Sequence, residues 1–138
     1  MVTTLILCPV DGTDHAAVGL AMAVELALLM QAHLTICAIN LATGGARGPT
    51  QNLWSDAAAA ALLTKVEGEA RALGATRLNL ILLTARSPGA AIVAFAAAIE
   101  ASHVVMGCGS GTDGKRGMLG SVAAEVAGQA RCSVTIAR

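Results

Sequence analysis

Short runs of hydrophobic, β-favouring residues alternate along the chain with alanine-rich segments whose apolar residues repeat at the period of a helix. The strands are predicted at residues 3–10, 33–40, 77–84, 103–107 and 132–138. The helices are predicted near residues 14–31, 54–73, 88–100 and 120–130. This alternation favours βαβ units, so the pattern predicts an α/β fold with a mostly parallel sheet.

The strand runs differ in how continuous their hydrophobic residues are. Residues 3–10 and 33–40 are almost uninterrupted, which is typical of central strands covered by helices on both faces. In "CSVTIA" (132–137) the pattern alternates with period two and predicts an edge strand with one wetter face. Residues 41–52, "LATGGARGPTQN", are rich in glycine and polar residues, and we expect a mobile loop there.

Polar residues and one proline mark the predicted helix starts. Asp14 or Thr13 can cap the first helix, and Ser55 or Asp56 can cap the second. Pro88 suits the first turn of the third helix, where the missing N–H costs nothing. These signals support the predicted order of elements.

Length and composition narrow the class of protein. A chain of 138 residues fits one domain, residues 1–138, whose core needs neither metal nor disulfide. Glu25 and Glu100 interrupt the longest apolar stretches, so we expect no membrane span. No secretory signal is readable at the start, so we expect a cytoplasmic protein. The net charge of +0 and the single Trp and Phe argue against a nucleic-acid partner.

The residues that most often carry catalysis or bind metal form no recognisable pattern. The three histidines are scattered, and the four cysteines show no C-x-x-C spacing and are expected to act as small apolar residues: Cys8, Cys37, Cys108 and Cys132. We find no serine elbow, Cys/His spacing or paired carboxylates. An efficient enzyme is therefore not indicated, and no metal site is predicted.

The segment "GCGSGTDGKRGMLGS" (107–121) contains three overlapping phosphate-loop patterns. Residues 109–115 begin a P-loop, but Arg116 stands where the hydroxyl that binds magnesium is needed. Residues 109–114 match G-x-G-x-x-G, the motif that follows the first strand in dinucleotide-binding folds. Here the motif follows the fourth predicted strand, and the acidic residue expected about twenty positions later is absent from the sequence. In the third pattern Gly107 closes a strand, and Gly120 and Ser121 stand thirteen and fourteen positions later at a helix start. Such a loop can wrap a phosphate chain through backbone N–H groups and the helix dipole.

With this third pattern the whole chain resembles the universal stress protein family, whose nucleotide-binding members carry G-x-x-G, nine residues, then G-[ST]. "ILCPVDGTDHAAVGLAMAVELA" resembles the family's first strand, turn and helix, and "LTICAIN" resembles its second strand. "SPGAAIVAFA" is similar to its third helix start, and "VVMGCGS" to its fourth strand and glycine turn. The second glycine of the family motif is replaced by Ser110.

This resemblance implies a Rossmann-like fold of the adenine nucleotide α-hydrolase type, with five parallel strands in the order 3-2-1-4-5. Ligands of such sheets bind where the strand order reverses, here between the first and fourth strands. The resemblance implies that Asp11 and the backbone of Val10 and Ile39 hold adenine and ribose, and that Gly107 lets the ribose lie close. The full set of nucleotide-binding residues that we predict is Pro9, Val10, Asp11, Ile39, Met106, Gly107, Gly109, Ser110, Gly120, Ser121 and Val122. The expected ligand is ATP, with or without Mg²⁺, or AMP.

Simpler interpretations compete at several of these positions. Asp11 can merely hydrogen-bond the turn before the first helix, and Ser121 can merely be an N-cap. The leading hypothesis is a nucleotide-binding regulatory protein of the stress response, which forms a homodimer through its last strand and acts on an unidentified protein partner. A dimeric interaction module without nucleotide and a slow ATPase are the alternatives.

Overall fold

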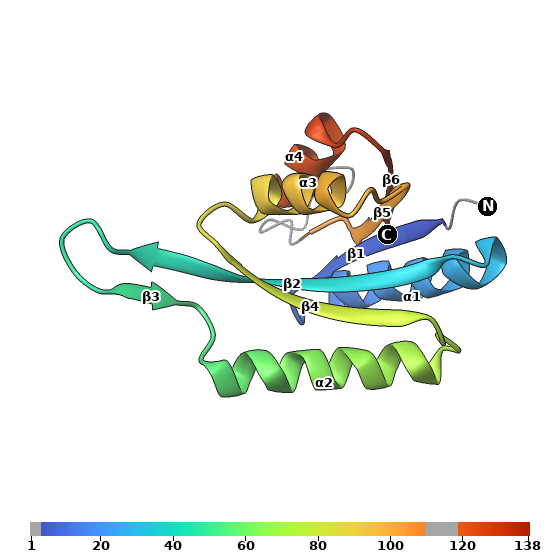
Figure 1. Cartoon of the computed structure of the whole chain (residues 1–138), viewed down its shortest axis with the longest axis horizontal. Coiled ribbons are helices and arrows are strands. Elements are labelled where there is room, and N and C mark those ends of the chain that lie inside the picture. Colours follow the sequence, from blue (N-terminus) through green and yellow to red (C-terminus); the bar gives the residue numbers. More distant parts are fainter. Residues whose placement is uncertain (1–3, 110–118) are drawn as a thin grey trace.

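The computed structural model describes residues 4–109 and 119–138, which form one layered α/β fold (Figure 1). The elements follow in the order β1 (Leu5–Val10), α1 (Asp14–Met30), β2 (His33–Gly44), β3 (Thr50–Asn52), α2 (Asp56–Ala72), β4 (Leu78–Ala85), α3 (Pro88–Ala98), β5 (His103–Gly107), α4 (Ser121–Gln129) and β6 (Ser133–Ala137). Each predicted strand and helix is present with similar bounds, and the prediction of alternating β and α elements is confirmed.

Five strands form a parallel sheet in the order β4-β2-β1-β5-β6, which confirms the predicted order 3-2-1-4-5. The registers of β1 against β2 and against β5 include Leu5 opposite His33 and Ile6 opposite His103. The short strand β3 pairs with β2 in the antiparallel sense and makes the sheet six-stranded and mixed. The strand count predicted from the sequence is thus one short.

The missing strand lies in the segment that we predicted to be a mobile loop, and that prediction is wrong. β2 continues to Gly44, and its last residues pair with β3 to form a hairpin that extends from the body of the molecule (Figure 1). Gly44 and Gly45 have φ angles of 78° and 96°, a left-handed conformation that glycine adopts at little cost. The glycines therefore build a turn between two strands.

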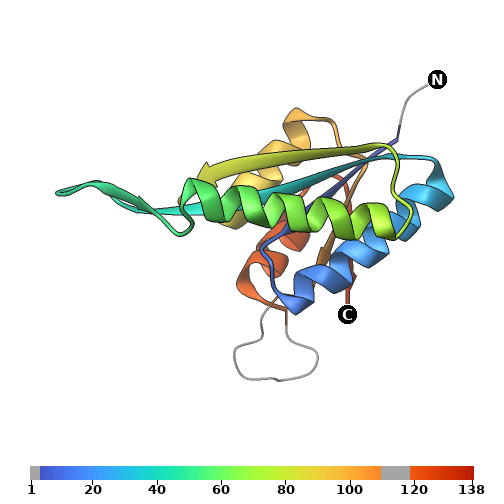
Figure 2. The same cartoon turned by 90° about the horizontal axis from the view of Figure 1, so that it is seen from below.

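The helices cover the sheet on both faces. Seen from below, α1 and α2 lie in front of the sheet, and α3 and α4 lie behind it (Figure 2). Successive residues of β1 serve opposite faces: Ile6 and Cys8 pack against α1 and α2, and Leu7 packs with Ile92 and Val126 of α3 and α4. This two-sided burial explains the continuous hydrophobic run of the first strand.

The helix starts follow the predicted capping residues. The side chains of Thr13 and Ser55 accept hydrogen bonds from the backbone N–H groups of Ala16 and Ala58. Pro88 occupies the first turn of α3. Among the described helices, none combines the length and hydrophobicity needed to cross a bilayer.

Candidate nucleotide site

A cavity of about 620 Å³ opens at the carboxyl ends of β1 and β5. The two strands are neighbours, but the chain leaves β1 for α1 on one face of the sheet and reaches α4 on the other face after β5. Strand order reverses at this point, where open α/β sheets bind ligands. The cavity is lined by every predicted site residue that the structure describes: Pro9, Val10, Asp11, Ile39, Met106, Gly107, Gly109, Gly120, Ser121 and Val122. Ser110 lies outside the described residues.

Ten further residues line the cavity, and the sequence patterns did not indicate them as site residues: Thr13, His15, Ala16, Leu41, Leu53, Trp54, Pro88, Ile92, Leu119 and Ala123. Most of them are apolar. Leu41 within β2, and Leu53 and Trp54 directly after β3, form one wall of the cavity that no motif predicts. The only available signal was that the single tryptophan of the chain comes after a glycine-rich segment.

Asn40 fixes that wall from inside the sheet. Asn40 is 2% exposed, which is unusual for an asparagine, a residue type that is mostly found at the surface. The Asn40 amide donates to the carbonyl oxygen of Trp54 at 2.9 Å, and its Oδ1 accepts from the backbone N–H of Trp54 at 2.8 Å. Both polar groups of Asn40 are therefore satisfied, and residue 54 is held at the cavity.

Asp11 lies at the mouth of the cavity and also orders the turn that leads into α1. Its Oδ1 accepts hydrogen bonds from the backbone N–H of Thr13 at 2.9 Å and from the Thr13 hydroxyl at 2.6 Å. Gly12 between them has a φ of 86°. The hydrogen bonds among the described residues use only Oδ1, so Asp11 combines the turn role with an exposed carboxylate oxygen.

Close backbone contacts explain the glycines around the cavity. A Cβ on Gly107 would collide with the carbonyl oxygen of His15, so the end of β5 can lie against α1 only without a side chain. Gly109 has a φ of 82°, and a Cβ there would lie 3.1 Å from the Cα of Gly120. The backbone N–H of Gly120 donates to the carbonyl oxygen of Cys108 at 2.7 Å. These contacts hold residues 109 and 120 together at the edge of the cavity.

The start of α4 differs from the simple N-cap interpretation. Gly120 is the N-cap residue, Ser121 is the first residue of the helix, and no side chain among the described residues caps this end. Of the Gly120–Ser121 pair that the sequence offered as an N-cap, Gly120 takes the N-cap position, and the Ser121 side chain is not the cap. The starts of α1 and α3 also border the cavity, through Thr13 and Pro88. Three helix N-termini thus surround one cavity, and their partial positive charges favour an anion there.

Two of the four cysteines are part of the core. Burial, with a smaller contribution from the Cys37 thiol, raises the pKa of Cys8, and burial raises the pKa of Cys37 to about 12. Both thiols stay protonated at neutral pH and act as apolar residues. Cys108 and Cys132 are half-buried. The described residues contain no cluster of three His, Cys, Asp or Glu side chains placed to hold a metal ion.

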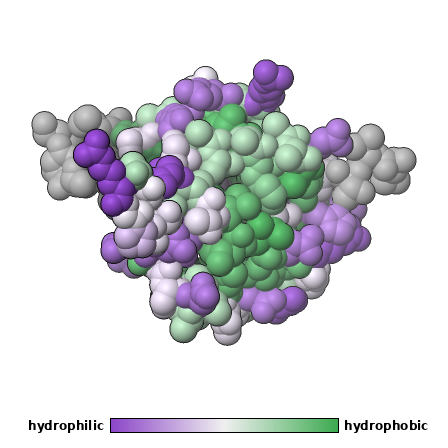
Figure 3. All heavy atoms as spheres, turned by 60° about the vertical axis from the view of Figure 1, so that its left-hand side comes forward, coloured by the Kyte–Doolittle hydropathy of each residue, from purple (hydrophilic) through white to green (hydrophobic). Residues whose placement is uncertain are grey.

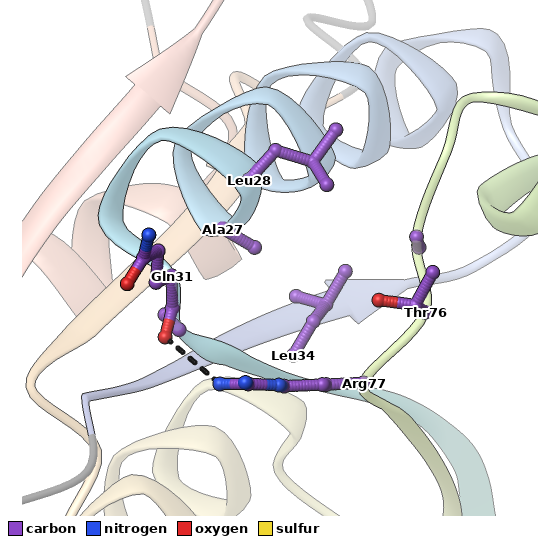
Figure 4. A pocket seen from close by; sticks show the side chains of 8 residues that line it. Ala27, Leu28, Gln31, Leu34, Thr76 and Arg77 are labelled. Atoms are coloured by element: carbon purple, nitrogen blue, oxygen red, sulfur yellow. Dashed lines mark hydrogen bonds between the residues drawn. The ribbon is translucent and has the colours of Figure 1, made fainter.

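A second cavity, of about 290 Å³, lies at the opposite ends of the strands, between the end of α1 and the segment before β4 (Figure 4). Its lining includes Ala27, Leu28 and Leu34, and the Arg77 guanidinium donates to the carbonyl oxygen of Gln31 at 3.4 Å. The only charged group among the described residues of this lining thus has a partner within the protein. The switch-point cavity is the better candidate for a ligand.

The surface on the β3 side of the molecule contains both hydrophobic and hydrophilic residues. Figure 3 turns this side forward and shows hydrophobic residues gathered in the middle of the face, with hydrophilic residues around them. The carboxyl end of β2 points to the same side in Figure 1. An apolar surface with a polar border is typical of a face that binds a ligand or a partner.

Comparisons with known proteins agree with this geometry. A family model described as "Universal stress protein family" matches residues 4–138. The chain belongs to the universal stress protein family. A search of the curated proteins finds no match.

Solved structures of other universal stress proteins share the fold. A universal stress protein from Archaeoglobus fulgidus is 26% identical, with a TM-score of 0.77 over 100% of this chain and 96% of that chain. A universal stress protein in complex with cAMP is 23% identical, with a TM-score of 0.76 over 100% and 98%. The Archaeoglobus fulgidus protein in complex with dAMP is 24% identical, with a TM-score of 0.72 over 99% and 98%. Adenine nucleotides are thus the ligands of two structural neighbours.

Proposed function

We propose that this universal stress protein binds an adenine nucleotide, AMP or ATP, in the cavity at the carboxyl ends of β1 and β5, and that it acts as a nucleotide-dependent regulator in the stress response. One observation carries the proposal: the described residues that the family motif assigns to the nucleotide all line one cavity at the switch point. The complexes of two structural neighbours with cAMP and dAMP support the choice of ligand.

The cavity suits a nucleotide in size and in the distribution of its groups. Its volume of about 620 Å³ lies within the range of about 300–1,000 Å³ that is usual for small-molecule sites. Val10, Ile39 and Leu41 offer apolar surface for adenine, and Asp11 offers a carboxylate for hydroxyl or amino groups. Gly109 and the start of α4 offer backbone N–H groups for phosphates.

A Mg²⁺ ion in this cavity would be coordinated mainly by the nucleotide and not by the protein. Asp11 is the only carboxylate among the described lining residues. A magnesium ion at such a site takes most of its ligands from phosphate oxygens and water, which is its usual coordination with nucleotides. We therefore propose that Mg²⁺ accompanies ATP and is not required for AMP.

Asp11→Asn tests the role of the carboxylate, because asparagine keeps an acceptor for Thr13 but replaces the second oxygen by a donor. We expect the AMP affinity to fall at least tenfold, about 1.4 kcal/mol, while the melting temperature stays nearly unchanged. Asp14→Asn is the control, since Asp14 is an exposed neighbour that does not line this cavity. Equal AMP affinities of the wild type and Asp11→Asn would remove Asp11 from the site.

We further propose a homodimer through β6. Among the described strands β6 pairs only with β5, so one of its edges carries unpaired backbone groups, and Val134 and Ile136 stay only half-buried. Antiparallel pairing with the same strand of a second copy would satisfy these groups about a two-fold axis.

Proline substitutions in β6 test this dimer. Successive N–H groups of a strand point to opposite edges, so one of residues 134 and 135 donates toward β5 and the other toward the free edge. Of the two variants Val134→Pro and Thr135→Pro, one therefore removes only a donor on the free edge and leaves the bonds to β5 intact. We expect a dimer for the wild type by light scattering at micromolar concentration, and a folded monomer for one of the two variants. A wild-type monomer, or two folded variants that remain dimers, would contradict the proposal.

A further inference from the structure

The cavity edge carries a cysteine–histidine pair to which the proposed nucleotide binding assigns no role. Cys108 follows β5, and His15 lies in the first turn of α1, 93 positions away in the sequence. The Sγ atom of Cys108 lies 3.5 Å from Nδ1 of His15, within hydrogen-bond distance for sulfur. No sequence spacing indicates this pair.

Backbone packing holds the two side chains together. Gly107, directly before Cys108, lies so close to the backbone carbonyl of His15 that a Cβ would not fit between them. Gly19, one turn further along α1, approaches the backbone of Gly107 in the same way. The two glycine contacts therefore bring the backbones of residues 15 and 107 together, which places the His15 side chain within reach of Cys108.

The pair places a thiol beside a group that can accept its proton. The thiolate is the reactive form of cysteine, and an adjacent imidazole can accept the thiol proton. Reagents can approach, because His15 is exposed and Cys108 is half-buried. The Cys108 thiol is also within hydrogen-bond distance, as a donor, of the carbonyl oxygen of Gly109 at 3.6 Å.

The other three cysteines lack this environment. Cys8 in β1 and Cys37 in β2 are buried between the sheet and the helices, and burial raises the pKa of each thiol. Cys132 is half-buried like Cys108, but no hydrogen bond among the described residues joins it to a histidine. Cys132 is therefore an internal control of similar exposure.

We propose that Cys108, with His15 as its base, is a thiol modification site that exchanges with small disulfides such as glutathione disulfide. The imidazole accepts the thiol proton, and Sγ attacks one sulfur of the disulfide. A new S–S bond forms to Cys108 as the original S–S bond breaks, and the leaving thiolate takes the proton from the imidazolium. The products are a mixed disulfide and one free thiol, with no net change in electrons.

The rate of modification at each cysteine tests this proposal without any nucleotide, so the result is independent of the proposed function. The whole chain is incubated with glutathione disulfide, quenched with acid and mapped by peptide mass spectrometry. We expect the mixed disulfide at Cys108 to form at least tenfold faster than at Cys132, with Cys8 and Cys37 unmodified in the folded protein. Equal rates at Cys108 and Cys132 would overturn the proposal.

The role of His15 is tested by His15→Gln, with His33→Gln as the matched control at a distant histidine. We expect His15→Gln to slow modification of Cys108 about tenfold, and His33→Gln to leave it unchanged. The rate at Cys132 reports whether each variant keeps its fold, since a general opening of the protein would raise it. An unchanged Cys108 rate in His15→Gln, with an unchanged Cys132 rate, would show that the imidazole does not activate the thiol.

Discussion

Gly19→Ala is expected to lower the free energy of unfolding by about 2 kcal/mol, although alanine is the better helix former. Gly19 is buried in α1 against the end of β5. A Cβ on Gly19 would collide with the backbone nitrogen of Gly107 and lie 2.7 Å from the carbonyl carbon of Met106. Backbone atoms of a central strand cannot rotate away, so α1 must move off the sheet.

Gly68→Ala is the matched control for this prediction, since Gly68 lies inside α2 and a Cβ added there would have no atom within 4 Å. Here the change should raise the free energy of unfolding by up to about 1 kcal/mol. Urea unfolding followed by circular dichroism measures both variants. A Gly19→Ala protein as stable as the wild type would mean that α1 does not press against β5 as described.

Gly120→Val is expected to reduce adenine nucleotide affinity at least a hundredfold, about 2.7 kcal/mol. Even a Cβ at Gly120 would lie 3.1 Å from the Cα of Gly109 and 3.3 Å from the carbonyl oxygen of Cys108. The two methyl groups of valine would separate these segments and cover the first N–H groups of α4, where we place the phosphates.

Gly128→Val makes the same change on the same helix, near its other end, where no atom lies within 4 Å of a Cβ. This control should keep the wild-type affinity in a calorimetric titration with ATP and Mg²⁺. If Gly120→Val bound ATP as tightly as Gly128→Val, the phosphates would not lie at the start of α4.

The fold and much of the cavity lining were predictable from local signals. Strand positions follow from short hydrophobic runs, and the helix starts at Thr13, Ser55 and Pro88 follow from side-chain chemistry that acts within one turn. The spacing of Gly107 and Gly120 indicated a phosphate loop without any relative. The order of strands came with the family resemblance, because spacing alone does not specify which strands are neighbours.

The errors and omissions have a common physical cause in tertiary contacts. Glycine-rich residues 41–52 suggested a loop because the same residue that loosens a chain also builds a hairpin turn. The Asn40–Trp54 clamp and the Cys108–His15 pair join residues 14 and 93 positions apart. Neither sequence separation corresponds to a helix or strand repeat. Only the folded structure therefore reveals which polar groups meet.

Isothermal titration calorimetry of the whole chain with AMP, and with ATP plus Mg²⁺, tests the proposed nucleotide binding most directly. We expect saturable heat from one site per chain, with affinity in the micromolar range or weaker, and loss of that heat in Gly120→Val but not in Gly128→Val. No saturable heat from the folded wild-type protein with either nucleotide would contradict nucleotide binding and favour an interaction module that works without a nucleotide.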